Sequence, residues 1–358
     1  MGIKDLTKFL EEKKLDKDAK VLVPLKDLSG YAIAIDANVW MYRAESGAMK
    51  SYLSSVFVDV TEPIPIEPII RVIISQMYGL LEKFILYNIT PVWIFDGPAH
   101  PEKEKAAKMR RKIEKISKKE NIEAERKRII EMSPLERTTD VIANFKKMLL
   151  QNIRVGREEI DAVFGELTSL GVPCFIAPYD SEILCSALSR EKKVIGVFSN
   201  DSDCYASGAR AIFKSFSAQP TEDGLCFETI IPSVIHENMG MDLRQFRDFC
   251  IMLQCDFNVR IPGLGPVNAY RLLQRYDNNL DALMEAEPYR DWDLLNVHNS
   301  RELLHGPSET CIDMSELFID REKWNSVIEN KDFFLAPPET DPMLVECIDE
   351  EDIDIVNL

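Results

Sequence analysis

Acidic residues stand at the ends of several apolar, strand-like runs in this 358-residue sequence. Three of these acids each follow one such run: Asp36 after 31–35, Asp96 after 91–95 and Asp201 after 193–198. The carboxyl ends of parallel strands meet at one edge of an open sheet, so the three carboxylates are expected to converge there. That edge is where open α/β sheets bind their ligands.

Four further acids extend this set. Asp180 and Glu182 follow another strand-like run where a helix is expected to begin, Asp203 lies one serine beyond Asp201, and Asp256 follows an apolar helical run. Crowded carboxylates repel one another, and some would stay protonated unless a cation compensates their charge. Any one of them alone could equally be a helix cap or a turn residue. All seven in this arrangement indicate a metal site instead.

Hard carboxylate oxygens are the ligands that Mg²⁺ or Mn²⁺ prefers. Two such ions could activate a water and stabilise the leaving oxygen in phosphodiester hydrolysis. A glycine-rich turn, Gly263-Leu-Gly265, lies shortly after Asp256 and precedes a helix. Its backbone N–H groups could seat a phosphate at the helix N-terminus, although most turns of this kind are only turns.

The elements that must position these acids alternate between strands and helices. Strands are expected at 31–35, 91–95, 172–176 and 193–198, and helices at 4–14, 66–87, 157–169, from Asp180, and over 243–290 with one glycine-rich interruption. This order predicts an α/β fold with a mostly parallel central sheet flanked by helices. After Asp291 the pattern weakens, and from about Pro337 it is irregular.

Taken over the whole chain, the net charge of −17 argues against a nucleic-acid partner. The charge is unevenly distributed, however, because residues 101–130 carry +6 and residues 308–358 carry −12. The basic stretch has no Pro or Gly between 102 and 130, so it is expected to be helical. It could be a solvated surface helix or resemble a nuclear localisation signal at 108–112, or it could meet phosphate.

The composition, 46% hydrophobic and 29% charged, excludes a fibrous repeat and a wholly disordered chain. No apolar run is long enough to span a bilayer, and the first residues show no signal-peptide pattern, so an intracellular location is expected. The cysteines are scattered without a Cys-x-x-Cys pair, which disfavours structural zinc and predicts buried free thiols. They are Cys174, Cys185, Cys204, Cys226, Cys250, Cys255, Cys311 and Cys347.

Together these motifs resemble the flap endonuclease family of structure-specific 5′ nucleases, which includes 5′ exonucleases. The similarity begins at Met1-Gly2-Ile3 and covers about residues 1–280, in the family's order and at compatible spacing. It is carried by Ala34-Ile-Asp36-Ala37, Ile94-Phe-Asp96-Gly97, Ala177-Pro-Tyr-Asp180-Ser-Glu182, Ser199-Asn-Asp201-Ser-Asp203-Cys204 and Cys255-Asp256-Phe257, followed by Pro262-Gly-Leu-Gly-Pro266.

The resemblance implies two Mg²⁺ ions, replaceable by Mn²⁺. One would be held mainly by Asp36, Asp96, Asp180 and Glu182, and the other mainly by Asp201, Asp203 and Asp256. It also implies a helical arch, in which Lys103 and Arg110 reach the scissile phosphate. Tyr42 would stack on a base near the cut, and Gly2 would lie beside the site. Gly263 and Gly265 would belong to a helix–two-turn–helix near 256–276 that grips duplex DNA with K⁺.

The implied domain organisation is one integrated nuclease domain: an N-terminal region 1–100, an arch insertion 101–150, an internal region 151–280 and a C-terminal extension with an acidic tail 281–358. Asp180 stands where the family usually has Glu, and Asn200 where Glu is common. The Gln-containing motif that binds a sliding clamp is absent at 331–334. The usual basic tail is replaced by acids at 349–352.

The resemblance implies a metal-dependent nuclease that cuts at 5′-flap/duplex junctions in DNA replication, repair or recombination. Alternatives are a 5′→3′ double-strand exonuclease of the same family, or a non-catalytic nucleic-acid-binding scaffold. The full set of acids and both arch cations disfavour the scaffold. Expected partners are DNA flaps, nicks or ends, with no membrane and doubtful clamp recruitment. A monomer is expected, nuclear in a eukaryotic cell and cytoplasmic if viral or prokaryotic.

Overall fold

The structure is a computed structural model that describes residues 2–54, 59–114, 122–133, 135–218, 222 and 224–317, without the side chains of 111–114. Cys347, the segments 331–334 and 349–352 and the tail after Pro337 lie outside the described residues. The chain forms two compact units. We call them the sheet unit (1–39, 84–116 and 173–318) and the helical unit (40–83, 117–172 and 319–358).

The sheet unit contains a seven-stranded sheet in the order β1-β7-β6-β5-β2-β3-β4. Its strands are β1 Lys20–Pro24, β2 Ala32–Asp36, β3 Thr90–Phe95, β4 Cys174–Ile176, β5 Val197–Phe198, β6 Ile212–Phe216 and β7 Cys226–Ile230. The five neighbouring strands β6, β5, β2, β3 and β4 pair in parallel. Strand β7 pairs antiparallel with both β6 and β1. The predicted α/β fold with a mostly parallel sheet is confirmed. The strand expected over 193–198 is shorter, and β1, β6 and β7 were not predicted.

The interiors of the central strands β2 and β3 are hydrophobic. Ile33, Ala34 and Ile35 of β2 are fully buried, as are Val92 and Trp93 of β3. Parallel strands covered on both faces show such continuous apolar runs. This burial explains why the two runs that end in Asp36 and Asp96 could be recognised as strands.

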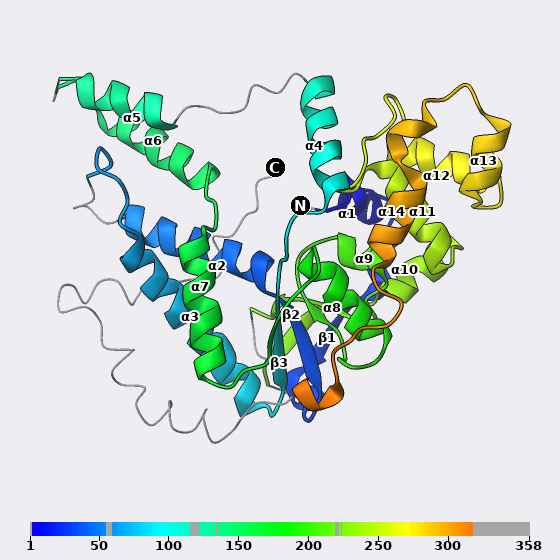
Figure 1. The fold of residues 1–358 in the computed structure, drawn as a ribbon, viewed down its shortest axis with the longest axis horizontal. Coiled ribbons are helices and arrows are strands. Elements are labelled where there is room, and N and C mark those ends of the chain that lie inside the picture. The colour runs from blue at the N-terminus through cyan, green and yellow to red at the C-terminus, as the bar shows by residue number, and fades with distance from the viewer. Residues whose placement is uncertain are drawn as a thin grey trace. The chain divides into compact units, whose positions relative to one another are not determined.

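The sheet unit also contains helices. They are α1 Leu6–Glu12, α4 Pro101–Glu114, α8 Ser181–Arg190, α9 Asp203–Ser207, α10 Pro232–Met239, α11 Leu243–Leu253, α12 Pro266–Gln274, α13 Leu280–Ala286 and α14 Val297–His305. Figure 1 shows α11, α12, α13 and α14 grouped together, and α11 contacts each of the other three. The predicted interruption of 243–290 separates α11, α12 and α13, whereas α14 lies where the sequence pattern had weakened. Described 3₁₀ helices cover Lys17–Ala19, Leu25–Leu28, Trp292–Leu295 and Met314–Leu317.

The helical unit is built from α2 Ala37–Ser54, α3 Ile66–Leu86, α5 Ile122–Glu131, α6 Thr139–Gln151 and α7 Arg157–Ser169. The first residues of α2 and the last residues of α3 belong to the sheet unit. Its core contains Leu53, Val60, Ile129, Phe145 and Leu149. The basic stretch 102–130 therefore forms two helices, α4 and α5, with 115–121 outside the described residues. No described helix has both the length and the apolar character that crossing a bilayer requires.

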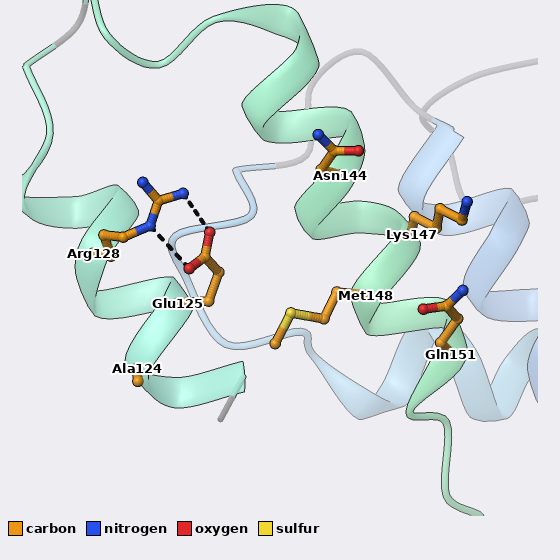
Figure 2. Close-up of a pocket in the computed structure, with 7 residues that line it drawn as sticks. All are labelled: Ala124, Glu125, Arg128, Asn144, Lys147, Met148 and Gln151. Carbon is orange, nitrogen blue, oxygen red and sulfur yellow. Dashed lines mark hydrogen bonds and ion pairs between the residues drawn. The ribbon is translucent and has the colours of Figure 1, made fainter. Parts of the chain in front are cut away.

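A groove of about 540 Å³ lies between α5 and α6. Figure 2 shows its lining, with the Arg128–Glu125 ion pair on α5 and Lys147 on α6. The remaining lining residues are Ala124, Asn144, Met148 and Gln151. The groove therefore includes none of the residues predicted for the site.

Two buried glutamates lie in the helical unit. Glu45 on α2 and Glu159 on α7 are 6% and 5% exposed, and one oxygen of each accepts no hydrogen bond from any residue that the structure describes. Burial, followed by the negative charge of Glu159, raises the pKa of Glu45 to about 7. The fold therefore favours the protonated form of Glu45.

We expect this glutamate to make the melting temperature fall as pH rises. The stability associated with neutral Glu45 is complete below about pH 4 and is lost as pH rises through 7. Glu45→Gln should remove roughly 2 kcal/mol of the difference in unfolding free energy between pH 5 and 8, measured by thermal melting. Glu158→Gln, at an exposed position, is the control. A wild-type pH slope in Glu45→Gln would contradict the expectation.

Candidate functional site

Three acids lie at the carboxyl edge of the parallel strands. Asp36 is the last residue of β2, Asp96 directly follows β3, and Asp201 lies three residues after the end of β5. Strand β2 pairs in parallel with both β3 and β5, so the three strands end at the same edge. The structure brings these acids together as the sequence predicts.

Asp36 is held from three directions. Its carboxylate is 1% exposed and accepts hydrogen bonds from Ser181 Oγ at 2.9 Å, Ser199 Oγ at 2.8 Å and the backbone N of Val39 at 3.2 Å. The two serines come from different segments, one at the start of α8 and one after β5. This carboxylate therefore has a single fixed orientation.

Asp96 shares one of these partners. Its carboxylate accepts a hydrogen bond from the Ser181 backbone N at 2.8 Å and another from Asn38 Nδ2. Ser181 thus contacts both Asp36 and Asp96, and Ser199 contacts Asp36. Sequence reasoning did not assign Asn38, Ser181 or Ser199 to the site. The only signal for the serines was their position inside the acidic motifs.

The acids that follow the strands lie at helix N-termini. Asp180 is the N-cap residue of α8, Glu182 lies in its first turn, and Asp203 begins α9. Figure 1 shows α8 close to β2 and α9, and α8 contacts both. Negative charge is stabilised at a helix N-terminus, so the local fold favours carboxylates there. Asp201 Oδ1 accepts a hydrogen bond from the Asp203 backbone N at 2.9 Å.

The charges of these groups act on one another. Burial raises the pKa of Glu182 well above its ordinary value, and the negative charges of Asp201, Asp36, Asp180 and Asp203 raise it further. Interactions of this kind require the carboxylates to be close. At least five of the seven acids therefore form one electrostatic cluster.

The remaining two acids belong to the same cluster. Burial raises the pKa of Asp203 well above its ordinary value, and the charges of Asp201 and Asp256 add to this effect. Burial also raises the pKa of Asp36 to about 7, with further contributions from Asp201 and Asp96. All seven predicted acids are thus gathered in the sheet unit, where a cation would relieve their mutual repulsion.

Two cations of α4 contact this cluster. Lys103 Nζ lies 2.8 Å from Asp180 Oδ1 and 2.9 Å from Asp256 Oδ2. Burial opposes the lysine charge, but Asp256 and Asp180 outweigh burial and raise the pKa of Lys103. Arg110 donates hydrogen bonds of 3.3 Å to the backbone carbonyls of Cys255 and Asp256. The structure therefore places both predicted cations at the acids.

The donor set has the chemistry of a divalent-metal site. Its ligands are hard carboxylate oxygens, and Asp180 Oδ2 and Asp203 Oδ1 are buried without a hydrogen bond from any described residue. Among the described residues, no group of three or more His, Cys, Asp or Glu side chains is arranged as a metal-binding set. Instead, the Lys103 ammonium lies between Asp180 and Asp256. The residues fit a divalent ion in type, charge and unmet hydrogen bonding.

Gly2 lies against the acid cluster. Its φ is +96°, and a Cβ atom there would stand 2.2 Å from Asp201 Oδ1 and 2.4 Å from Ser202 Oγ. The next backbone N, of Ile3, donates a hydrogen bond of 2.7 Å to the same Ser202 hydroxyl. Only glycine fits here, and the structure places Gly2 beside the site as the resemblance implies.

The glycine-rich turn lies between α11 and α12. Gly263 has φ +80°, and Gly265 is the N-cap residue of α12. Gly263 also lines a cavity of about 190 Å³ that includes the arginines Arg271, Arg275 and Arg290. The turn is therefore part of a basic surface in the sheet unit. The remaining predicted residue, Tyr42, is on α2 in the helical unit and is 38% exposed.

Two arginines bind the C-terminal end of α9. Arg190, the last residue of α8, donates to the Ser207 carbonyl, and Arg247 of α11 donates from Nε to the Ala206 carbonyl at 3.1 Å. Arg247 Nη2 also lies 3.4 Å from His305 Nδ1 of α14. Helices α8 and α9 carry Asp180, Glu182 and Asp203, and α11 leads to Asp256. The arginines thus fix the relative position of helices that present four of the seven acids.

We expect Arg247→Met to loosen this arrangement. The Mn²⁺ concentration that gives half-maximal thermal stabilisation should rise about tenfold, since groups that orient metal ligands contribute on that scale. Arg301→Met is the matched control, because Arg301 joins α14 to Asp248 of α11 without a contact to α9 in the described residues. It should lower the melting temperature but leave the Mn²⁺ response unchanged. An equal change in both variants would contradict the expectation.

Two family models match the chain. The XPG N-terminal domain matches residues 1–117, and the XPG I-region matches residues 171–256. Asp36, Asp96, Lys103 and Arg110 lie in the first range. The second contains the other five acids, which are Asp180, Glu182, Asp201, Asp203 and Asp256.

Named relatives and solved structures agree with these matches. Flap endonuclease 1 of Entamoeba histolytica is 27% identical over 340 residues, covering 92% of this chain and 81% of the relative. Flap endonuclease 1 of Cryptosporidium muris is 28% identical over a match that covers 91% of this chain and 66% of the relative. The catalytic core of Rad2 in complex with a DNA substrate superposes with a TM-score of 0.60 at 16% identity. The match covers 94% of this chain and 96% of the Rad2 chain.

An archaeal structure shares the fold as well. Flap endonuclease-1 from Methanococcus jannaschii superposes with a TM-score of 0.53 at 20% identity, covering 87% of this chain and 90% of that one. Its similarity and that of Rad2 extend over most of each chain. Both structures therefore establish the fold, while the sequence matches establish the relationship.

Proposed function

Because this chain belongs to the flap endonuclease family and is a structure-specific 5′ nuclease, we propose that it cuts 5′-flap/duplex junctions with the help of divalent metal ions. The observation that supports metal use is the cluster of seven acids at one sheet edge, contacted by Lys103 and Arg110. No other role explains why so many mutually repelling carboxylates are gathered and buried together.

Seven residues would hold two Mg²⁺ ions, or Mn²⁺ in their place. Asp36, Asp96, Asp180 and Glu182 would mainly hold one, and Asp201, Asp203 and Asp256 the other. When bound, the ions supply an activated water and stabilise the leaving oxygen. Ser181 and Ser199 orient the acids through the hydrogen bonds to Asp36 and Asp96. Asp180, one methylene shorter than the usual Glu, is still within reach of Lys103.

The chain's cations would bind the phosphate that is cut. Lys103 and Arg110 would offset the charge that develops on its oxygens, an effect that is large in a partly buried site. Residues 101–150 would form the arch that admits the 5′ end, with Tyr42 stacking on a base near the cut. The backbone at Gly263 and Gly265 would hold the duplex, with K⁺ and the nearby arginines balancing phosphate charge.

The proposal also covers the oligomeric state, the pathway and the location of the protein. The protein would act as a monomer in replication, repair or recombination. Recruitment by a sliding clamp is not part of the proposal, since the given sequence shows no Gln-containing motif at 331–334. Its location would be nuclear in a eukaryotic cell and cytoplasmic in a viral or prokaryotic setting.

The test compares a labelled 5′-flap DNA with a nicked duplex, each with Mg²⁺ and with a chelator. We expect an intact flap to be released in Mg²⁺ and cleavage to stop in chelator, because the acid cluster then lacks its compensating ions. Stepwise release of mononucleotides from both substrates would instead support an exonuclease. DNA binding without cleavage under every condition would overturn the proposal and support a scaffold.

A further inference from the structure

An exposed tyrosine lies next to the buried acids and has no role in the mechanism above. Tyr179 is 42% exposed and directly precedes Asp180, which is 7% exposed. Phe257, which follows Asp256, is by contrast buried at 3%. Tyr179 therefore presents an aromatic surface to solvent immediately beside a proposed metal ligand.

The backbone around Tyr179 is tightly held. Its carbonyl accepts a hydrogen bond of 2.7 Å from the backbone N of Gly97. A Cβ atom on Gly97 would stand 2.1 Å from the Ala177 carbonyl oxygen, so the two chain segments touch closely. The position of Tyr179 is thus tied to the segment that carries Asp96.

The Tyr179 ring is also supported by another ring. The centroid of His100 lies 4.5 Å from that of Tyr179, in an edge-to-face contact, and 6.5 Å from that of Phe257. His100 is itself fixed, because its Nδ1 accepts a hydrogen bond of 3.2 Å from the backbone N of Glu102. An edge-to-face contact engages at most one face of the tyrosine ring. Support of this kind lowers the entropy that binding to the ring would cost.

The pair of rings formed by Tyr179 and His100 is close to Lys103, the lysine proposed to bind phosphate. The backbone carbonyl of His100 accepts a hydrogen bond of 3.0 Å from the backbone N of Lys103, and the Lys103 side chain contacts Asp180. In a nucleic acid, each base is joined to its phosphate through a single sugar. A phosphate at Lys103 therefore brings a base of the same strand near Tyr179, where an unpaired base could stack.

We propose that Tyr179, supported by His100, is a stacking subsite for an unpaired nucleobase next to the scissile phosphate. The inference rests on the proposed function, since it assumes that the strand to be cut lies at Lys103. The ligand class is a nucleobase rather than a base-specific partner, because every base has an aromatic face. The subsite would hold the strand in position for the cut.

The test uses flap substrates in which one abasic residue is placed at each position around the scissile phosphate. At the position whose base would stack on Tyr179, removing the base should lower kcat/KM of the wild type about 5- to 150-fold. Tyr179→Leu should lose a similar factor on the intact flap, and the abasic residue should then cause no further loss. Tyr179→Phe, which keeps the aromatic face, should retain most of the activity. Tyr31→Leu is the control, because Tyr31 is 51% exposed and lies before the start of β2, away from Asp36 at its end.

A second readout does not depend on cleavage. In an Asp201→Asn background, a fluorescent 2-aminopurine at the same position should be quenched on binding, and Tyr179→Leu should restore its fluorescence. Equal losses for Tyr179→Leu on intact and abasic flaps, or unchanged quenching, would overturn the inference. Failure of the wild type to cut any flap would count against the proposed function instead.

Discussion

Replacing Asp201 with asparagine is expected to slow flap cleavage at least about a thousandfold while flap-DNA binding stays within a few-fold of wild type. Asparagine has the same size and retains the oxygen that accepts the Asp203 N–H, so the local fold is preserved. It lacks the negative charge that would hold a metal ion. Single-turnover cleavage rates and fluorescence anisotropy of labelled flap DNA would measure the two quantities separately.

Asp27→Asn is a suitable control, because Asp27 is exposed and lies in a 3₁₀ helix between β1 and β2. It should cut and bind as the wild type does. The thermal melting curve of Asp201→Asn should stay cooperative. Wild-type cleavage by Asp201→Asn would show that the metal assignment is wrong.

Lys103→Ala is expected to have two opposite effects. Cleavage should fall about 10²- to 10³-fold, because a charge that stabilises the transition state is lost. Metal binding to the DNA-free protein should become tighter, since the ammonium group lies within 3 Å of both Asp180 and Asp256 and competes with a metal ion for them. The raised pKa of Lys103 means that this competition persists at neutral pH.

Mn²⁺ titration followed by electron paramagnetic resonance would measure the affinity, and single-turnover assays would measure the rate. Lys105→Ala provides the matched control, because Lys105 is on the same helix, is 66% exposed and pairs only with Glu102 in the described part of the chain. Weaker Mn²⁺ binding in Lys103→Ala would mean that the lysine helps to assemble the ligands instead of competing with metal.

The acids at the strand ends could be predicted because burial shapes the sequence on both sides of them. Residues 32–35 of β2 and 91–95 of β3 are apolar, so the strand ends are visible as a change from Ile35 to Asp36 and from Phe95 to Asp96. Strand β1 could not be recognised in this way. It lies at the sheet edge, and Val21 and Leu22 are 38% and 52% exposed, so its pattern resembles a loop.

Other features depend on contacts that a sequence does not display. Helix α14 is short and polar, and it is held by Arg301, which forms two hydrogen bonds with Asp248 across 53 residues. The hydrogen bond from Ser181 to Asp36 spans 145 residues, and that from Lys103 to Asp180 spans 77. Residue type suggested which groups could do chemistry, whereas the serines and arginines that contact them or their helices are visible only through tertiary contacts.

The interleaved strand order has a consequence for biosynthesis. Strand β1 pairs with β7, which is made some 200 residues later, and β2 pairs with β5. In a nascent chain β2 can pair early with β3, but β1 has no partner until β7 has been synthesised, after more than half of the sequence. Such long-range pairing slows folding. A nascent chain contains all seven acids only once Asp256 has been added. Translation products that end before residue 256 would thus lack part of the acid cluster.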